Sequence, residues 1–134
     1  MSKRKGELCK TYDQNIIDAL NKTKFPIIGV NGKSFLIREK ARNENGKEHI
    51  ARKDHRLKVK DIDNLINLLK HPQYICNDPD NPVYKNYYGI RKGDNSKLFI
   101  KVVTSPIKGE KNTEEIVTIY PTNSIKVERI KKNL

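Results

Sequence analysis

The sequence has no tryptophan, one methionine and only two cysteines. Cys9 and Cys76 lie far apart and have no CxxC spacing, whereas a structural zinc site needs more ligands at shorter intervals. We therefore expect two free thiols. No run approaches 18 apolar residues, and the charged segment MSKRKGELCK at residues 1–10 is not followed by an apolar stretch. These absences argue against a membrane-spanning helix and against a secretory signal.

Several catalytic motifs are missing as well. The sequence contains no HExxH, no EF-hand loop, no phosphate-binding P-loop and no Gly-x-Ser-x-Gly. The one close pair of acidic residues in a loop between strands is Asp78 and Asp80, and Pro79 between them suits a turn. Chemistry that depends on a metal therefore fits poorly, and we expect neither a metal nor another cofactor.

Positive charge is in excess. Among 134 residues, 28 Lys and Arg stand against 16 Asp and Glu, which gives a formal net charge of +12. Such an excess attracts polyanions, and nucleic acid is the commonest of them. A membrane surface is a weaker alternative because no strongly amphipathic basic helix is evident. A basic protein that is merely soluble is the plain alternative from composition alone.

Two segments have helical periodicity. Ile16, Ile17 and Leu20 predict a short helix within residues 12–22, and Asp13 lies near its start. The clearest element is residues 57–72, where one apolar stripe consists of Ile62, Leu65, Ile66 and Leu69. Pro72 ends this central helix.

The other segments predict strands. Asn31-Gly32 indicates a β-hairpin over residues 24–39, because both residues tolerate positive φ. A second Asn-Gly, at residues 45–46, is assigned to a polar loop. Further strands are expected over residues 83–92, 97–105 and 114–121, and a short helical or irregular tail over 124–134.

These elements define an α+β class, with an N-terminal helix and a central helix packed on a curved antiparallel sheet of about four strands. We expect a disordered basic tail at residues 1–10 and a single domain at 11–134. Alternation along the strands places Lys101, Thr118 and Tyr120, together with Arg91, on the side of the sheet away from the central helix. Val117 and Ile119 are expected to form an apolar pair on the other side.

The segment EHIARKDHR, residues 48–56, gathers two histidines and three certain cations. On a helix, one face would carry His49, Arg52, Lys53 and Arg56. On an extended segment, His49, Lys53 and His55 would share a side. An imidazole titrates near neutral pH and can take or give a proton, so either geometry could serve RNA cleavage without a metal. The alternative is an ordinary phosphate-binding patch with exposed histidines.

The order of EHIARKDHR, the helix VKDIDNLINLLKHP, and the strands NYYGIRKG, KLFIKVVTS and EEIVTIYPT resembles the barnase–EndoU–colicin–RelE-like ribonuclease superfamily, especially its phage- and toxin-associated branches. The resemblance covers about residues 47–122, and the hairpin around FPIIGVNGKSFLIRE has no counterpart in the common core. It implies a helix packed on a curved sheet, RNA cleavage without metal, and in many members a neutralising protein partner.

We therefore expect a cytoplasmic endoribonuclease, a toxin or phage-borne effector. The resemblance implies that the superfamily's early His position corresponds to His49, with His55 in support, and that the superfamily's late hydroxyl positions correspond to Thr118 and Tyr120. The expected substrate-binding residues are Arg52, Lys53, Arg56, Arg91, Lys101 and Thr104. Partners would be RNA and an acidic immunity or antitoxin protein. Two alternatives are a non-catalytic nucleic-acid-binding module, in which Tyr87 and Tyr88 stack bases, and a phage structural or partner-binding domain.

Overall fold

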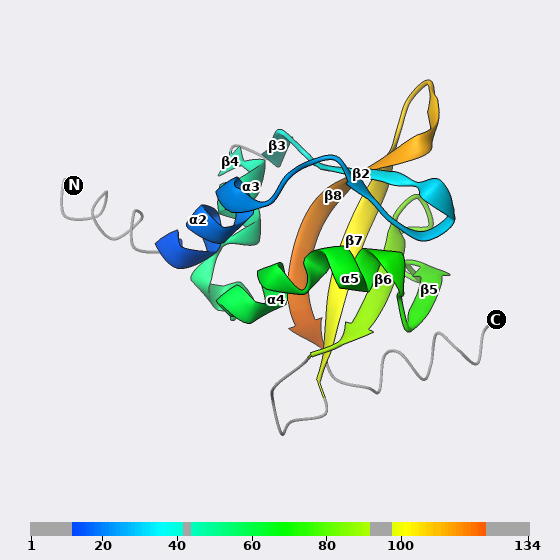
Figure 1. Ribbon diagram of the computed structural model, residues 1–134. Coiled ribbons are helices and arrows are strands. Elements are labelled where there is room, and N and C mark those ends of the chain that lie inside the picture. Colours follow the sequence, from blue (N-terminus) through cyan, green and yellow to red (C-terminus); the bar gives the residue numbers. More distant parts are fainter. Residues whose placement is uncertain (1–11, 42–43, 92–97, 123–134) are drawn as a thin grey trace.

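The computed structural model describes residues 12–41, 44–91 and 98–122 (Figure 1). The expectations for residues 1–10 and for the tail at 124–134 lie outside the described residues. Within the described part the class is α+β, as predicted.

The sheet has six strands. Their spatial order is β1 (Ile27–Ile28), β2 (Ser34–Ile37), β8 (Glu110–Thr122), β7 (Phe99–Ile107), β6 (Lys85–Ile90) and β5 (Tyr74–Asn77). All neighbours are antiparallel except β2 and β8, which are parallel. A separate pair consists of β3 (Lys40–Ala41) and β4 (Glu44–Asn45). The expected antiparallel sheet of about four strands is thus corrected to a mixed sheet of six, because the N-terminal hairpin joins β8 and the four-residue β5 adds an edge.

The first helix forms as predicted. Helix α2 (Gln14–Lys22) buries Ile16 and Leu20, and the Asp13 carboxylate accepts a hydrogen bond from the Asn15 amide at 2.9 Å. This side-chain bond satisfies one of the amides that a helix start leaves without a partner.

The central helix is divided in two. α4 (Val59–Asp63) and α5 (Leu65–Lys70) meet at Asn64, where the expectation was one continuous helix. Ile62, Leu65 and Leu69 are buried as the stripe predicts, but Ile66 is 40% exposed and Leu68 is buried instead. The interruption explains this exchange, because residues after the break no longer follow the spacing that one continuous helix would give.

The two Asn-Gly pairs have different structures. Asn31 and Gly32 both adopt positive φ, 57° and 73°, in the turn of the β1–β2 hairpin, which confirms that prediction. Asn45 instead caps α3 (Gly46–Ile50), since its side chain accepts a hydrogen bond from the Lys47 amide at 2.9 Å. The loop expected at the second pair is therefore corrected to a helix start, where Asn is also favoured.

The core lies between the helices and one face of the sheet, and Figure 1 shows α4 and α5 crossing in front of that face. Phe35 from β2 meets Tyr87 from β6 edge to face, with ring centroids 5.2 Å apart. From β7 and β8 the core receives Val102, Ile116 and Ile119. The paired apolar face predicted from Val117 and Ile119 is corrected by a register shift, which brings Ile116 into the core beside Ile119.

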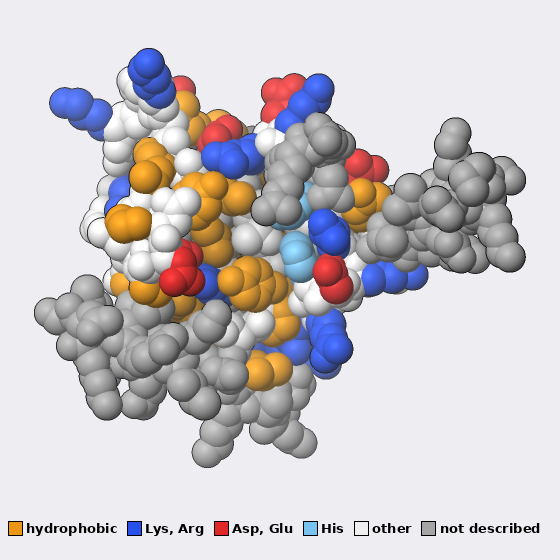
Figure 2. All heavy atoms as spheres, turned by 180° about the vertical axis from the view of Figure 1, so that it is seen from behind, with side chains coloured by type: hydrophobic (Ala, Val, Ile, Leu, Met, Phe, Trp, Pro, Cys, Tyr) orange, Lys and Arg blue, Asp and Glu red, His pale blue; other side chains and the backbone are white. Residues whose placement is uncertain are grey.

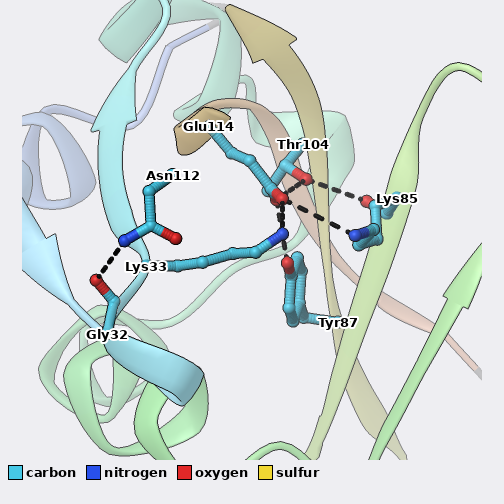
Figure 3. Close-up of polar contacts among 7 residues, drawn as sticks. All are labelled: Gly32, Lys33, Lys85, Tyr87, Thr104, Asn112 and Glu114. Atoms are coloured by element: carbon cyan, nitrogen blue, oxygen red, sulfur yellow. Dashed lines mark hydrogen bonds and ion pairs between the residues drawn. The ribbon is translucent and has the colours of Figure 1, made fainter. Parts of the chain in front are cut away.

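A buried carboxylate links several strands of the sheet (Figure 3). Glu114 accepts hydrogen bonds from Tyr87 at 2.8 Å and from Thr104 at 2.7 Å, pairs with Lys33, and lies 3.7 Å from the Lys85 ammonium. Burial would raise the pKa of Glu114, but hydrogen bonds from Lys33, Thr104 and Tyr87 outweigh it and the pKa is lowered. The ionised carboxylate therefore holds β2 and β8 to the neighbouring strands.

Close packing of α5 on β6 gives a first prediction. A Cβ atom at Gly89 would lie 2.5 Å from the Leu68 Cγ, so Gly89→Ala should lower the free energy of unfolding by about 1–3 kcal/mol. Because Leu68→Ala removes the clashing atoms, the double variant should lose less than the sum of the two single variants. Urea denaturation of all four proteins measures this coupling, and strictly additive losses would contradict the contact.

Candidate functional site

The histidine-containing segment is held against β8 by its buried apolar residues. Ile50, Ala51 and Leu57 anchor it in the core, and the Asp13 amide donates to the Ala51 carbonyl at 2.8 Å. The segment is neither wholly helical nor extended, because α3 is followed by the single 3₁₀ turn η2 (Lys53–His55). Figure 1 shows α3 beside β8, and this contact brings residues from the middle of the chain to its last described strand.

Two histidines, a tyrosine and a lysine are neighbours in space and form a row across this junction. The ring centroids of His49 and His55 are 5.6 Å apart, and those of His55 and Tyr120 are 6.1 Å apart. The Lys101 ammonium nitrogen lies 5.3 Å from the centre of the Tyr120 ring. We call these four residues the histidine site. Figure 2 shows this face of the molecule, with histidine side chains among cationic and acidic ones.

The protonation state of His55 follows from its contacts. Its Nδ1 lies 3.0 Å from the Ile50 carbonyl oxygen. A carbonyl can only accept, so Nδ1 carries the hydrogen and the neutral ring has its lone pair on Nε2. Burial lowers the pKa of His55 from its ordinary value, against the opposing effects of the Ile50 hydrogen bond and of Asp54. His55 is thus a neutral base at a lower pH than an ordinary histidine.

The register of the sheet places further polar groups on the same face. Lys101 is paired with Tyr88 on one side and Tyr120 on the other, and Thr118 follows the same face of β8. Lys101 is only 5% exposed, and its ammonium lies 4.0 Å from the Asp78 carboxylate. The Thr118 hydroxyl is buried and has no hydrogen-bond partner within the part of the chain that the structure describes. The histidine site therefore contains a nearly buried cation, and a buried hydroxyl lies on the same face of β8 as its tyrosine.

A cleft of about 570 Å³ opens next to His55 and Tyr120. The residues that line it are Asp54, His55, Arg56, Arg91, Leu98 and Tyr120, with the chain at 121–122. The lining therefore combines charged side chains with rings and apolar side chains, a combination that suits a ligand with a charged group and a flat ring.

The cations on the surface lie close to this cleft. Lys53 and Arg56 are exposed, and the Arg52 guanidinium pairs with Asp54 at 3.5 Å. The side chains of Arg52 and Asp54 are 40% and 68% exposed, so solvent screens this pair. The structure thus brings together eight of the ten expected site residues around β8 and η2: His49, Arg52, Lys53, His55, Arg56, Lys101, Thr118 and Tyr120.

Two expected substrate-binding residues are instead bound to buried carboxylates of the protein. Thr104 lies on the helix-covered face, where its hydroxyl donates to Glu114, because alternation along β7 places it on the same side as Ile100 and Val102. Arg91 lines the cleft but is only 6% exposed, and its guanidinium is bound to Asp61. Its strand position puts it on the helix side of the sheet, so its expected place beside Lys101 is wrong.

The base-stacking role suggested for Tyr87 and Tyr88 is also wrong. They are 1% and 0% exposed, with Tyr87 in the main core and Tyr88 packed against Cys76 on the opposite face. Asp78 and Asp80 lie in a local turn, where the Asp78 carboxylate accepts a hydrogen bond from the Asp80 amide at 2.8 Å.

Sequence reasoning missed the partners that organise the site. Asp61 was not among the expected site residues, yet it is 4% exposed and paired with Arg91. Asp78 appeared in a turn, and its proximity to Lys101 depends on how β5 and β7 are placed relative to β6. For Arg91 the sequence did contain a signal. Alternation along the segment of β6 puts Tyr88 and Arg91 on opposite faces of the sheet, and Tyr88 shares its face with Lys101.

Comparison with protein-family models, with curated proteins and with solved structures finds no match to this chain. Within the described ranges, no helix has both the length and the apolar character needed to cross a membrane. The same residues contain no group of three or more His, Cys, Asp or Glu side chains arranged to hold a metal ion.

The environment of His55 gives a second prediction. In nitrogen-15 NMR spectra, His55 should keep the neutral form with hydrogen on Nδ1 down to a pH below about 6.5, the ordinary histidine value. The reason is burial, which disfavours the imidazolium ion. The same residue in urea-unfolded protein serves as the control and should titrate near 6.5. Titration of folded His55 at or above the unfolded value would contradict the assignment.

Proposed function

We propose that the protein is an endoribonuclease that cleaves RNA without a metal ion. The observation that carries the proposal is the histidine site, where a neutral imidazole with a free Nε2 lies between a second histidine and the Tyr120–Lys101 pair. Such a pair of rings can supply both a base and an acid at neutral pH.

In the proposed reaction, Nε2 of His55 accepts the proton of a ribose 2′-hydroxyl. The 2′-oxygen forms a bond to the adjacent phosphorus, and the bond from phosphorus to the 5′-oxygen breaks. His49, in its protonated form, donates a proton to the leaving 5′-oxygen. The products are a 2′,3′-cyclic phosphate and a 5′-hydroxyl, so atoms and protons balance. The two rings meet nearly perpendicular with their centroids 5.6 Å apart, so both lie close enough to act on one phosphodiester bound at their exposed edges.

Cations and hydroxyls stabilise the charge that develops on the phosphate. Arg56 is exposed at the cleft, and Lys101 acts from below the Tyr120 ring, where burial strengthens its field. Tyr120 orients the phosphate or donates to its oxygens, and the buried Thr118 hydroxyl would do so once the bound RNA uncovers it. Arg52 and Lys53 hold neighbouring phosphates along the chain, and the net charge of +12 draws RNA to this surface.

The wider expectations form part of the same proposal. The chain would belong to the superfamily that it resembles, act on cytoplasmic RNA as a toxin or phage-borne effector, and be neutralised by an acidic protein. The basic surface around the cleft supports such a partner, because an acidic surface would complement it.

A second candidate is binding of RNA without cleavage. Exposed Lys53 and Arg56 support it, since phosphate contacts alone provide affinity that falls with salt. Product formation separates the two candidates, because both predict binding that weakens at high salt.

The third prediction concerns the two histidines. Wild-type protein with RNA and EDTA should yield cleavage products, whereas His49→Ala and His55→Ala should each lower the rate by about 10²–10⁴-fold, because each removes one proton-transfer group. Gel analysis of single-turnover reactions measures the rates. The acid side of the pH profile should fall through a pKa below about 6.5, because protonated His55 cannot act as the base.

His71→Ala is the matched control, since His71 is exposed at the end of α5 and outside the histidine site. It should cleave at the wild-type rate. Salt-sensitive binding with no product from wild-type protein would favour the binding module. Equal rates for all three variants would remove the histidines from the reaction.

A further inference from the structure

A buried ion pair fastens the helical layer to the end of β6. The Arg91 guanidinium donates to both carboxylate oxygens of Asp61, from Nε at 3.1 Å and from Nη2 at 2.9 Å. The two residues are 6% and 4% exposed. A two-point pair of this kind fixes orientation as well as distance.

The same pair holds the segment that follows His55. Nη2 of Arg91 also donates to the Arg56 carbonyl at 3.1 Å, and the Asp61 carboxylate accepts from the Lys58 amide at 2.8 Å. Both ends of residues 56–58 are therefore bound to one guanidinium–carboxylate unit. We call Arg91, Asp61 and these two backbone contacts the clasp.

The backbone at the clasp needs such support. Arg56 has φ 57° and ψ 34°, a left-handed conformation that is uncommon for residues other than glycine. It ends η2 directly after His55, and its carbonyl is the one that Arg91 binds. Without this contact the segment could relax toward commoner angles and move the ring of His55.

Stability alone does not explain the arrangement. A buried ion pair often contributes little net stability, because desolvation of two charges offsets their attraction. The clasp does fix the backbone directly after His55, through the bond from Arg91 to the Arg56 carbonyl. The Ile50 carbonyl holds the His55 ring itself.

We propose that Arg91 and Asp61 are positioning residues, which set the place of His55 relative to Tyr120 without touching the RNA. This inference rests on the proposed function and deepens it. It also gives Arg91 a role different from the phosphate contact expected from sequence, since two of its nitrogens are used by Asp61 and the Arg56 carbonyl.

The fourth prediction uses Arg91→Lys, which keeps the charge but cannot bind Asp61 at two points and the Arg56 carbonyl together. We expect kcat for RNA cleavage to fall about 10- to 100-fold because His55 is misplaced, with KM within about twofold of wild type. Arg38→Lys is the matched control. Arg38 pairs with Glu115 at 3.5 Å away from the cleft, so this variant should retain wild-type kcat.

NMR of His55 provides a second measurement that does not require activity. In Arg91→Lys the imidazole nitrogen shifts and the pKa of His55 should change, whereas in Arg38→Lys they should not. The charged groups that act on His55 are Asp54, His49 and Arg52, and none of them is altered. If wild-type protein does not cleave RNA, the proposed function fails, and the NMR comparison still decides whether the clasp positions His55.

A double variant that removes both charges addresses the case in which a single substitution prevents folding by leaving one buried charge unpaired. Asp61→Asn combined with Arg91→Gln leaves no unpaired buried charge, yet it removes the guanidinium from the Arg56 carbonyl. This protein should show the same kcat loss and the same His55 changes. Unchanged His55 signals in folded Arg91 variants would overturn the inference. So would an equal kcat loss in Arg38→Lys, which would indicate a general structural effect.

Discussion

The arrangement of the site depends on the pairing of β8 with β7. Val103 is opposite Thr118, but Thr104 is opposite Ile116, so β8 contains one extra residue at Val117. This bulge lets Ile116 and Ile119 both face the core, while Thr118 and Tyr120 face the other way with Lys101. A bulge is a known way to re-aim side chains near functional sites. The inserted residue thus adds Ile116 to the core, and regular alternation after it keeps Thr118 and Tyr120 on the face of the histidine site.

Two buried carboxylates hold the elements around that strand. Glu114 joins β2 and β8 to β6 and β7, and Asp61 joins the helical layer to the end of β6 through Arg91. Each is satisfied by several donors, which is the condition under which a buried charge is tolerated. The histidine site lies at the margin of this framework, where η2 meets Tyr120. Its rings are part exposed and its supports are buried, which is the arrangement that the proposed RNA site would need.

Local sequence signals predicted much of the fold. Apolar spacing identified α2 and the α4–α5 region, and Asn31-Gly32 identified the first hairpin, because helix periodicity and positive φ are local properties. The parallel pairing of β2 with β8 was not predicted, since it joins residues 34–37 to 113–116 and no local pattern encodes that contact. The same limit applies to the site. Alternation placed Lys101, Thr118 and Tyr120 on one face, but the burial of Arg91 and Thr104 depended on partners distant in sequence.

The central claim is that the ribose 2′-hydroxyl is the nucleophile and that the histidine site moves its proton. An RNA oligonucleotide with a single 2′-deoxy nucleotide on the 5′ side of one cleavage position tests this most directly, with product ends analysed by mass spectrometry. The account predicts that cutting stops at that position alone and that cuts elsewhere leave 2′,3′-cyclic phosphate ends. Cleavage at the deoxy position at an undiminished rate would contradict it, because no 2′-hydroxyl is present there to attack.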